Sequence, residues 1–348
     1  MFARSLTSSV ALATLIAMAS SAGVALASAS PALASPVRAA AASASAAHSP
    51  EVATSSDGEG ASVPFTEYNA VGSKNNGTVI GPSTNLYTLP AEAVGRTAVT
   101  LSGKGKYVDF VLAKPANSVD LRYSIPDSAN GSGLTTPLKV YVNGKERPDL
   151  TLTSKYTWFY GSYPFTNNPA SLDGHHLYDD VRTLLGKTLP AGTHVRFETA
   201  NAVPVTVNVA DFQMVAPPAP QPRGSLSVLS YGADPTGKKD STTAIQNAIN
   251  AGSAKHKVVY IPAGNFKVTA HLIVNKVTLT GAGEWYSVLG GNNVGVYGNL
   301  PPHPSTNVHL SNFAIFGQVT DRVDSADVNG IGGALADSTI SNVWIQHV

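Results

Sequence analysis

Two patterns of hydrophobic and polar residues divide the sequence. Between residues 63 and 215, short segments alternate apolar and polar positions, which is typical of strands with one buried face. The clearest segments are Tyr107 to Leu112, Ser118 to Ile125, Leu138 to Val142, His194 to Phe197 and Val203 to Val209. Asn143-Gly144 follows the third segment, and Asn-Gly is a strong hairpin signal. The pattern predicts a β-sandwich with a short helix over residues 178–185.

A different pattern begins near Leu229. Residues 231–237 form a loop punctuated by glycine and proline. Residues 240–249 then predict a short helix, because Asp, Ser and Thr can cap its start and its apolar residues recur on one side. Residues 258–261 are β-branched and aromatic, which favours a strand that ends at Pro262. Alone, this order is also compatible with the start of an α/β unit.

The repeat that follows favours a solenoid instead. Residues 308–316 and 338–346 match at a spacing of thirty residues, and residues 276–281 are a looser earlier copy. The matched positions are Leu310 with Ile340, Ser311-Asn312 with Ser341-Asn342, and Ile315 with Ile345. One strand cluster per repeat, with Asn or Gly at a corner, is typical of a parallel β-solenoid. Stacked Asn side chains can hydrogen-bond along such a ladder. A plain antiparallel sheet with chance similarity is the alternative.

The composition limits the partners. Charged residues make up 13% of the chain and the formal net charge is +1, which argues against a nucleic-acid surface or a polybasic membrane patch. The sequence contains no cysteine, so it has neither disulfide bonds nor thiolate metal sites. We therefore expect no nucleic-acid partner, and we expect a monomer.

The N-terminal segments predict export. Residues 1–27 combine Arg4, an apolar stretch from Val10 to Ala19 and the cleavage pattern Ala25-Leu26-Ala27, as in a secretory signal peptide. A membrane anchor is the alternative, although small residues dominate the segment. We expect a secreted, extracellular protein without membrane association after signal removal. Residues 28–62 are rich in Ala, Ser and Pro and are expected to be a disordered linker.

The expected organisation places a proline-rich linker, residues 216–223, between two domains. The sandwich occupies residues 63–215 and the β-helix occupies residues 224–348. The predicted fold is therefore all-β, with an N-terminal sandwich, a capping helix and the first coils of a parallel β-helix. Because the chain ends inside a copy of the repeated strand, we expect it to be the N-terminal part of a longer protein.

Family resemblance adds to this interpretation. The run from Tyr231 to Ile249, with Val259 to Phe266, resembles the entry of the pectate-lyase-like right-handed β-helix superfamily. Its members have many substrates, so the fold alone does not specify one. The preceding sandwich, with residues 281–289, 312–317 and 329–333, resembles the mycodextranase and α-1,3-glucanase family, glycoside hydrolase family 87, over residues 63–348.

That resemblance implies a glycosidase that hydrolyses α-glucan (α-1,3-glucan or mycodextran) by general acid/base catalysis with aspartates, without a catalytic cofactor. The family's catalytic aspartates lie on later coils, which places them beyond Val348. One alternative is a pectin-type polysaccharide lyase or polygalacturonase on the same fold. The other is a non-catalytic glycan-binding or inactive fragment.

The sandwich also resembles carbohydrate-binding modules of families 6 and 35. The resemblance implies a structural calcium ion held by Glu67 and Asp211, since Ca²⁺ prefers carboxylate and carbonyl oxygens. Two solvated strand carboxylates are the alternative.

The remaining candidates are acids and aromatic residues. Asp321, Asp324 and Asp327 form the dense acidic group near the helix and are the catalytic candidates within the chain, although a solvated loop is the favoured interpretation. Trp285 and Tyr286 are candidates for a sugar-stacking platform, and Trp158 and Tyr160 lie in an aromatic-rich loop that could bind substrate. An interdomain contact is the alternative for that loop.

Overall fold

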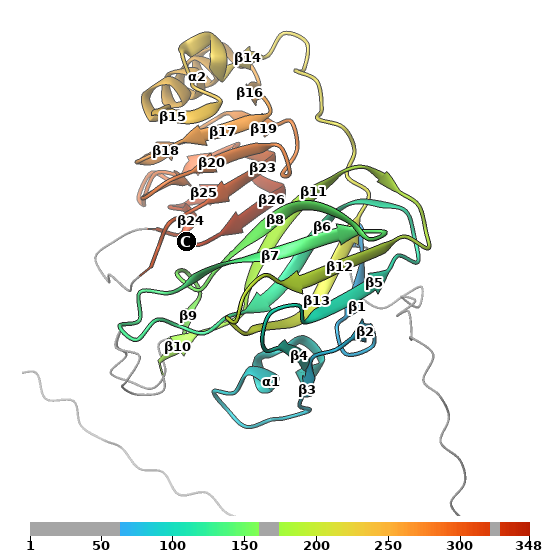
Figure 1. The fold of residues 1–348 in the computed structure, drawn as a ribbon. Helices are drawn as coiled ribbons and strands as arrows, with labels where there is room; N and C mark the ends of the chain where they lie inside the picture. The colour runs from blue at the N-terminus through green and yellow to red at the C-terminus, as the bar shows by residue number, and fades with distance from the viewer. Residues whose placement is uncertain (1–62, 160–173, 321–327) are drawn as a thin grey trace, which may run out of the picture. The chain divides into compact units, whose positions relative to one another are not determined.

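The computed structural model describes residues 63–159, 174–320 and 328–348 (Figure 1). They belong to one compact unit. Within these residues no helix has the length and apolar character needed to cross a membrane.

An antiparallel β-sandwich is formed by two sheets, named here after their strands β13 and β12. The β13 sheet has the order β11-β6-β13-β4-β3, and β1 also pairs with β13. Its strands are β1 (Phe65–Asn69), β3 (Thr78–Ile80), β4 (Ala98–Leu101), β6 (Ala116–Ser124), β11 (Asp179–Leu189) and β13 (Val205–Gln213). The β12 sheet has the order β2-β5-β12-β7-β8. Its strands are β2 (Lys74–Asn75), β5 (Tyr107–Val111), β7 (Thr135–Val142), β8 (Lys145–Thr153) and β12 (His194–Thr199).

Alternation along the strands builds the sandwich core. Val119, Leu121 and Tyr123 of β6 are buried, while Asp120 and Arg122 between them are only half-buried. Phe110 of β5 and Phe197 of β12 meet edge to face at 6.0 Å, and Phe110 has the same geometry with Phe212 of β13. Apolar residues therefore lie between the sheets, and charged residues lie on the outer faces.

Short elements complete the sandwich. They are α1 (Leu89–Glu92), the 3₁₀ turn η1 (Val94–Arg96), and the small hairpin of β9 (Trp158–Phe159) with β10 (His175–His176).

The helix expected over residues 178–185 is wrong. This segment belongs to β11, which pairs antiparallel with β6 from Asp179↔Tyr123 to Leu184↔Ser118. Its local sequence does not alternate cleanly, because Leu184 is 40% exposed while Asp180 and Arg182 are half-buried opposite Arg122 and Asp120 of β6. Pairing with a neighbouring strand decides the conformation here, and local propensity does not.

The second part of the chain is a right-handed parallel β-helix. Its main sheet has the order β14-β16-β19-β23-β20-β17-β15, and β26 also pairs with β23. These strands are β14 (Leu226–Ser227), β15 (Thr236–Asp240), β16 (Val259–Ile261), β17 (Gly264–Lys267), β19 (Thr278–Gly281), β20 (Ser287–Gly290), β23 (His309–Phe316) and β26 (Thr339–Gln346). The smaller sheets contain β18 (His271–Ile273), β21 (Gly295–Tyr297), β24 (Gly330–Gly332), β22 (Ser305–Thr306) and β25 (Leu335–Ala336).

The expected thirty-residue repeat is confirmed by the register. β23 and β26 pair in parallel with Leu310 opposite Ile340, Ser311 opposite Ser341 and Ile315 opposite Ile345. The looser copy is also in place, because Leu279 lies opposite Leu310. Apolar residues thus stack from coil to coil, which is how a solenoid builds its core.

An asparagine ladder marks one corner of the coils. Asn312 and Asn342 both adopt left-handed backbone conformations, with φ of 61° and 49°. The Asn342 side-chain amide donates to Asn312 Oδ1 at 3.3 Å, and the Asn312 side-chain amide donates to the Thr280 hydroxyl at 3.3 Å. Asn tolerates this conformation better than most residues, so one residue both turns the chain and links successive coils.

Helix α2 (Thr242–Lys255) covers one end of the stacked strands, after the 3₁₀ turn η2 (Val228–Tyr231) (Figure 1). Ile245, Ala248 and Ile249 are buried, as expected from their spacing. The Asp240 carboxylate accepts hydrogen bonds from the Thr242 backbone N–H and hydroxyl, so it satisfies one backbone donor of the first turn. The helix is six residues longer than expected at its C-terminal end and stops at His256, which is left-handed.

Candidate functional site

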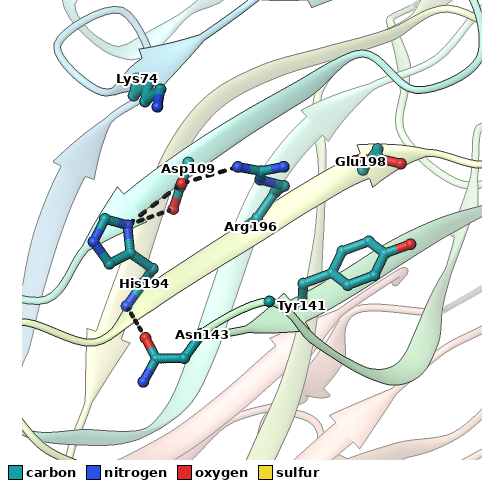
Figure 2. A pocket seen from close by; sticks show the side chains of 8 residues that line it. Lys74, Asp109, Tyr141, Asn143, His194, Arg196 and Glu198 are labelled. Carbon is teal, nitrogen blue, oxygen red and sulfur yellow. Dashed lines mark hydrogen bonds and ion pairs between the residues drawn. The ribbon is translucent and has the colours of Figure 1, made fainter.

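A pocket of about 680 Å³ lies on the outer face of the β12 sheet (Figure 2). It is lined by Lys74, Asp109, Tyr141, Asn143, Gly144, His194, Arg196 and Glu198. Strand register explains why these residues meet. Lys74 and Arg196 both lie opposite Asp109, and Tyr141 lies opposite Arg196, so they form one row across four strands. Residues distant in sequence therefore form one polar surface.

Asp109 forms the floor of this pocket. The residue is only 5% exposed, although it carries a carboxylate. His194 Nδ1 lies 3.3 Å from one carboxylate oxygen, and Arg196 Nη2 donates to the other at 3.4 Å. Figure 2 shows these three side chains pointing toward one another. The Arg196 guanidinium also stacks 4.0 Å above the ring of Tyr107, which fixes its orientation.

A second concave region, of about 450 Å³, crosses the coils of the β-helix. Its polar lining residues are Asn265, Lys267, Thr269, Asn292 and Gln318. Thr269, Asn292 and Gln318 each come two residues after paired positions of β17, β20 and β23, so these three follow one another from coil to coil. Gly290 and Gly291 keep part of its surface open. Neighbouring strands lie about 4.8 Å apart, so the hydroxyl of Thr269 and the amides of Asn292 and Gln318 follow one another at about this interval.

A row of charged residues crosses the outer face of the β13 sheet. Arg182 lies opposite Asp120, Asp120 lies opposite Asp211, and Asp211 lies opposite Glu67. Asp120 Oδ1 and Asp211 Oδ1 are buried and accept no hydrogen bond from the described residues. Burial, followed by Asp180 and Asp211, raises the pKa of Asp120 to about 8. Burial and then Glu67 raise the pKa of Asp211 to about 7.

These pKa values predict that stability falls as pH rises through neutrality. Between pH about 4 and 8 the folded protein keeps a proton on Asp120 that the unfolded chain has released, so folding takes up a proton. We expect a loss on the order of 1–3 kcal/mol across this range, measured by thermal unfolding at several pH values. Asp120→Asn mimics the protonated group, so it should flatten the curve. A parent protein whose stability rises from pH 5 to 8 would contradict the prediction.

Arg182 connects this row to the β-helix. Its guanidinium carbon lies 5.1 Å from the ring centre of Trp285, 4.7 Å from Phe316 and 4.6 Å from Trp344. Its Nη2 donates to the Glu284 carbonyl at 2.6 Å. Nearby, Asp179 binds the His347 ring nitrogen at 2.9 Å, and the Gln346 amide donates to the Asp180 carbonyl at 2.6 Å. The sandwich and the β-helix are therefore joined by half-buried polar and aromatic contacts.

Comparison with known proteins agrees with both parts. Residues 62–215 match the family model described as alpha-1,3-glucanase catalytic domain D1, and residues 225–346 match rhamnogalacturonase A/epimerase, pectate lyase-like. The catalytic unit of a thermostable GH87 alpha-1,3-glucanase from Streptomyces thermodiastaticus strain HF3-3 is 42% identical, with a TM-score of 0.72 over 83% of this chain and 51% of that one. The chain belongs to the GH87 α-1,3-glucanase family.

Other solved structures are similar to this chain as well. The Agl-KA catalytic domain is 26% identical with a TM-score of 0.75, and covers 83% of this chain and 53% of that one. A GH87 alpha-1,3-glucanase catalytic domain in complex with tetrasaccharides is 26% identical with a TM-score of 0.70, over 83% and 52%. The present chain thus spans about half the length of these relatives. No curated protein matches this chain significantly.

In this GH87 chain, Trp285 and Tyr286 are both half-buried. Trp285 lies against Arg182 and 6.3 Å from Trp344. The Tyr286 hydroxyl donates to the Ala216 carbonyl, at the start of the proline-rich segment. A stacking role for these rings therefore competes with contacts inside the protein.

The other predicted residues of this GH87 chain are dispersed. Trp158 is half-buried in the β9–β10 hairpin and packs edge-on against His176 at 4.8 Å. Tyr160, Asp321, Asp324 and Asp327 lie outside the described residues.

Glu67 and Asp211 do lie together as expected, directly opposed on β1 and β13. Calcium takes six to eight oxygen ligands. Among the residues that the structure describes, no group of three or more acidic, histidine or cysteine side chains is arranged to hold a metal ion. The two carboxylates are therefore adjacent, and further calcium ligands would have to be carbonyl oxygens or water.

Sequence reasoning missed the Asp109 pocket. Its residues are single polar positions in alternating strands, and each alone is ordinary for a solvent-facing side chain. Their row depends on strand order and register, which no local pattern specifies. The available signal was Asp109 within the apolar run of residues 107–112.

Proposed function

We propose that this GH87 chain is part of a glycoside hydrolase that acts on α-glucan, with α-1,3-glucan as the substrate. The observation that carries this proposal is the 42% identity to a GH87 alpha-1,3-glucanase over 83% of the chain. A more distant relative that holds tetrasaccharides supports oligosaccharide binding. Hydrolysis requires two carboxyl groups across the scissile bond. The described residues contribute the scaffold and the polar groove across the coils, where a polysaccharide would meet Asn265, Lys267 and Gln318.

The test is product release from three polysaccharides. The purified enzyme of which this chain is part is incubated with insoluble α-1,3-glucan, dextran and polygalacturonate, and reducing sugars are measured. We expect oligosaccharides from α-1,3-glucan alone. Unsaturated uronates from polygalacturonate would instead favour a pectin-type lyase, an alternative supported by the pectate-lyase-like family match over residues 225–346. Binding without product from any polymer would favour a non-catalytic glycan-binding protein.

We also propose that the protein is secreted and acts as a monomer. The signal-like pattern of residues 1–27 supports export, because it combines a positive charge, an apolar stretch and small residues at a cleavage pattern. Mass spectrometry of protein from culture medium should find a chain that lacks these residues. Retention of residues 1–27 in a cell-bound form would contradict this. Size-exclusion chromatography with light scattering measures the oligomeric state.

Calcium at Glu67 and Asp211 remains part of this proposal. An ion between them would relieve the repulsion that, after burial, raises the pKa of Asp211. We expect calcium to raise the melting temperature over that in EDTA, and Glu67→Gln to abolish the difference. Equal melting temperatures in calcium and EDTA would show that Glu67 and Asp211 bind no calcium, and that a proton rather than a metal ion reduces their repulsion.

A further inference from the structure

We propose that the Asp109 pocket on the β12 sheet is a binding site for a neutral glycan, separate from the groove on the β-helix. The pocket and the groove share no lining residue, and they lie on different sheets. The volume of about 680 Å³ falls within the usual range for small-molecule sites. The site would hold a short stretch of a longer polysaccharide.

A fixed carboxylate at the base of the pocket supports binding rather than a solvated strand surface. Asp109 is almost fully buried, and His194 and Arg196 hold it on two sides. Arg196 is itself held by stacking on Tyr107. The His194 backbone N–H donates to Asn143 Oδ1 at 2.9 Å, so the adjoining turn is also fixed. Polar groups whose positions are set before binding lose little conformational freedom on binding.

The balance of charges selects a neutral ligand. Lys74 and Arg196 contribute two positive charges, and Asp109 and Glu198 contribute two negative charges, so the lining is neutral when His194 is neutral. A phosphate, sulfate or uronate would meet two carboxylates, and a cation would meet Lys74 and Arg196. Sugar hydroxyls both donate and accept hydrogen bonds. They therefore match a lining that offers carboxylate and amide acceptors beside ammonium and guanidinium donors.

Tyr141 supplies the apolar part of the site. It lies opposite Arg196 on β7, and Figure 2 shows its ring across the pocket from Asp109 and His194. Its ring is half-exposed, with the Lys139 ammonium 6.0 Å from the ring centre. A half-exposed ring beside fixed hydrogen-bonding groups can pack against the C–H face of a pyranose. The inference that the ligand is neutral rests on the pocket itself. The inference that the ligand is α-1,3-glucan rests on the proposed function.

The test measures binding and hydrolysis separately. The whole chain is titrated with α-1,3-linked glucose oligosaccharides by isothermal calorimetry, with dextran and polygalacturonate oligosaccharides as comparisons. Tyr141→Ala and Lys74→Ala change the pocket, and Lys187→Ala is the matched control, since Lys187 is an exposed lysine on β11 of the opposite sheet. Melting temperatures establish that each variant is folded. We expect Tyr141→Ala to weaken binding roughly tenfold, Lys74→Ala to weaken it less, and Lys187→Ala to leave it unchanged.

Each contrary result has a distinct meaning. Equal affinity in the parent and both pocket variants would overturn the site, since the glycan would then bind elsewhere. No detectable binding of any oligosaccharide would overturn it as well. Preference for polygalacturonate would overturn the neutral ligand. If the glycan binds to the pocket but α-1,3-glucan yields no product, the binding site stands and the proposed hydrolysis is refuted. If α-1,3-glucan is hydrolysed but binding does not depend on the pocket residues, the hydrolysis stands and the binding site is refuted.

Discussion

Gly281→Ala is expected to destabilise the β-helix by about 3 kcal/mol and to lower its melting temperature by roughly 6–12 °C. Gly281 ends β19, where the next coil approaches closely. A Cβ atom there would collide with the carbonyl oxygen of Asn312 and lie 2.9 Å from the Cβ atoms of Phe313 and Ser287. These atoms are held by backbone, so no side-chain rotation can relieve the contact. Differential scanning calorimetry measures the effect.

Gly290→Ala is the matched control for that change. Gly290 ends β20, the strand that follows β19 along the chain, but the nearest atom to its added Cβ is the Phe316 carbonyl oxygen at 3.6 Å, an ordinary contact. We expect a change below about 1 kcal/mol. Equal melting temperatures for Gly281→Ala and the parent would show that the coils do not approach as closely as the structure indicates.

Arg182→Ala is expected to cost about 2–4 kcal/mol. The change removes a guanidinium from three aromatic rings, deletes the hydrogen bond to the Glu284 carbonyl, and leaves Asp120 without its opposed cation. Burial already lowers the pKa of Arg182 to about 10, so its aromatic and polar partners offset a real desolvation cost. Denaturant unfolding followed by tryptophan fluorescence measures the loss, because Trp285 and Trp344 report directly on this contact.

Two further variants separate charge from shape at this position. Arg182→Lys keeps the charge but lacks the planar group that stacks on rings, so it should fall between the parent and Arg182→Ala. Arg147→Ala removes an exposed arginine from β8 and should change stability by less than about 0.5 kcal/mol. If Arg182→Ala proves as stable as Arg147→Ala, then Arg182 does not join the two parts of the chain energetically.

The row of charged residues on the β13 sheet could be predicted only in part from the sequence. Glu67 and Asp211 were paired through resemblance, and the register places them opposite each other. The sequence did not predict that Asp120 and Arg182 extend the same row, since these residues lie on strands far apart in the chain. Strand order across the sheet decides which charges become neighbours. The raised pKa values of Asp120 and Asp211 follow from that order and from burial.

The β-helix was accessible to sequence reasoning because its contacts repeat. A residue in one coil meets the equivalent residue thirty positions later, so Leu310 with Ile340 and Asn312 with Asn342 are visible as a sequence period. The capping helix was also visible, since its apolar face follows the helical period. The segment at residues 178–185 was misjudged because its partner strand, β6, lies about sixty residues earlier.

Alternating strands, a capped helix and a thirty-residue solenoid repeat could all be predicted for this GH87 chain from its amino-acid sequence. These features are local or periodic, so short windows contain their physical causes. Three arrangements became visible only in the folded chain: Asp109, Arg196 and Tyr141 share a pocket, Arg182 lies among aromatic rings, and the half-buried Asp120 lies opposite Asp211. Those arrangements depend on antiparallel register between distant strands, where a shift of one residue would turn each side chain to the other face.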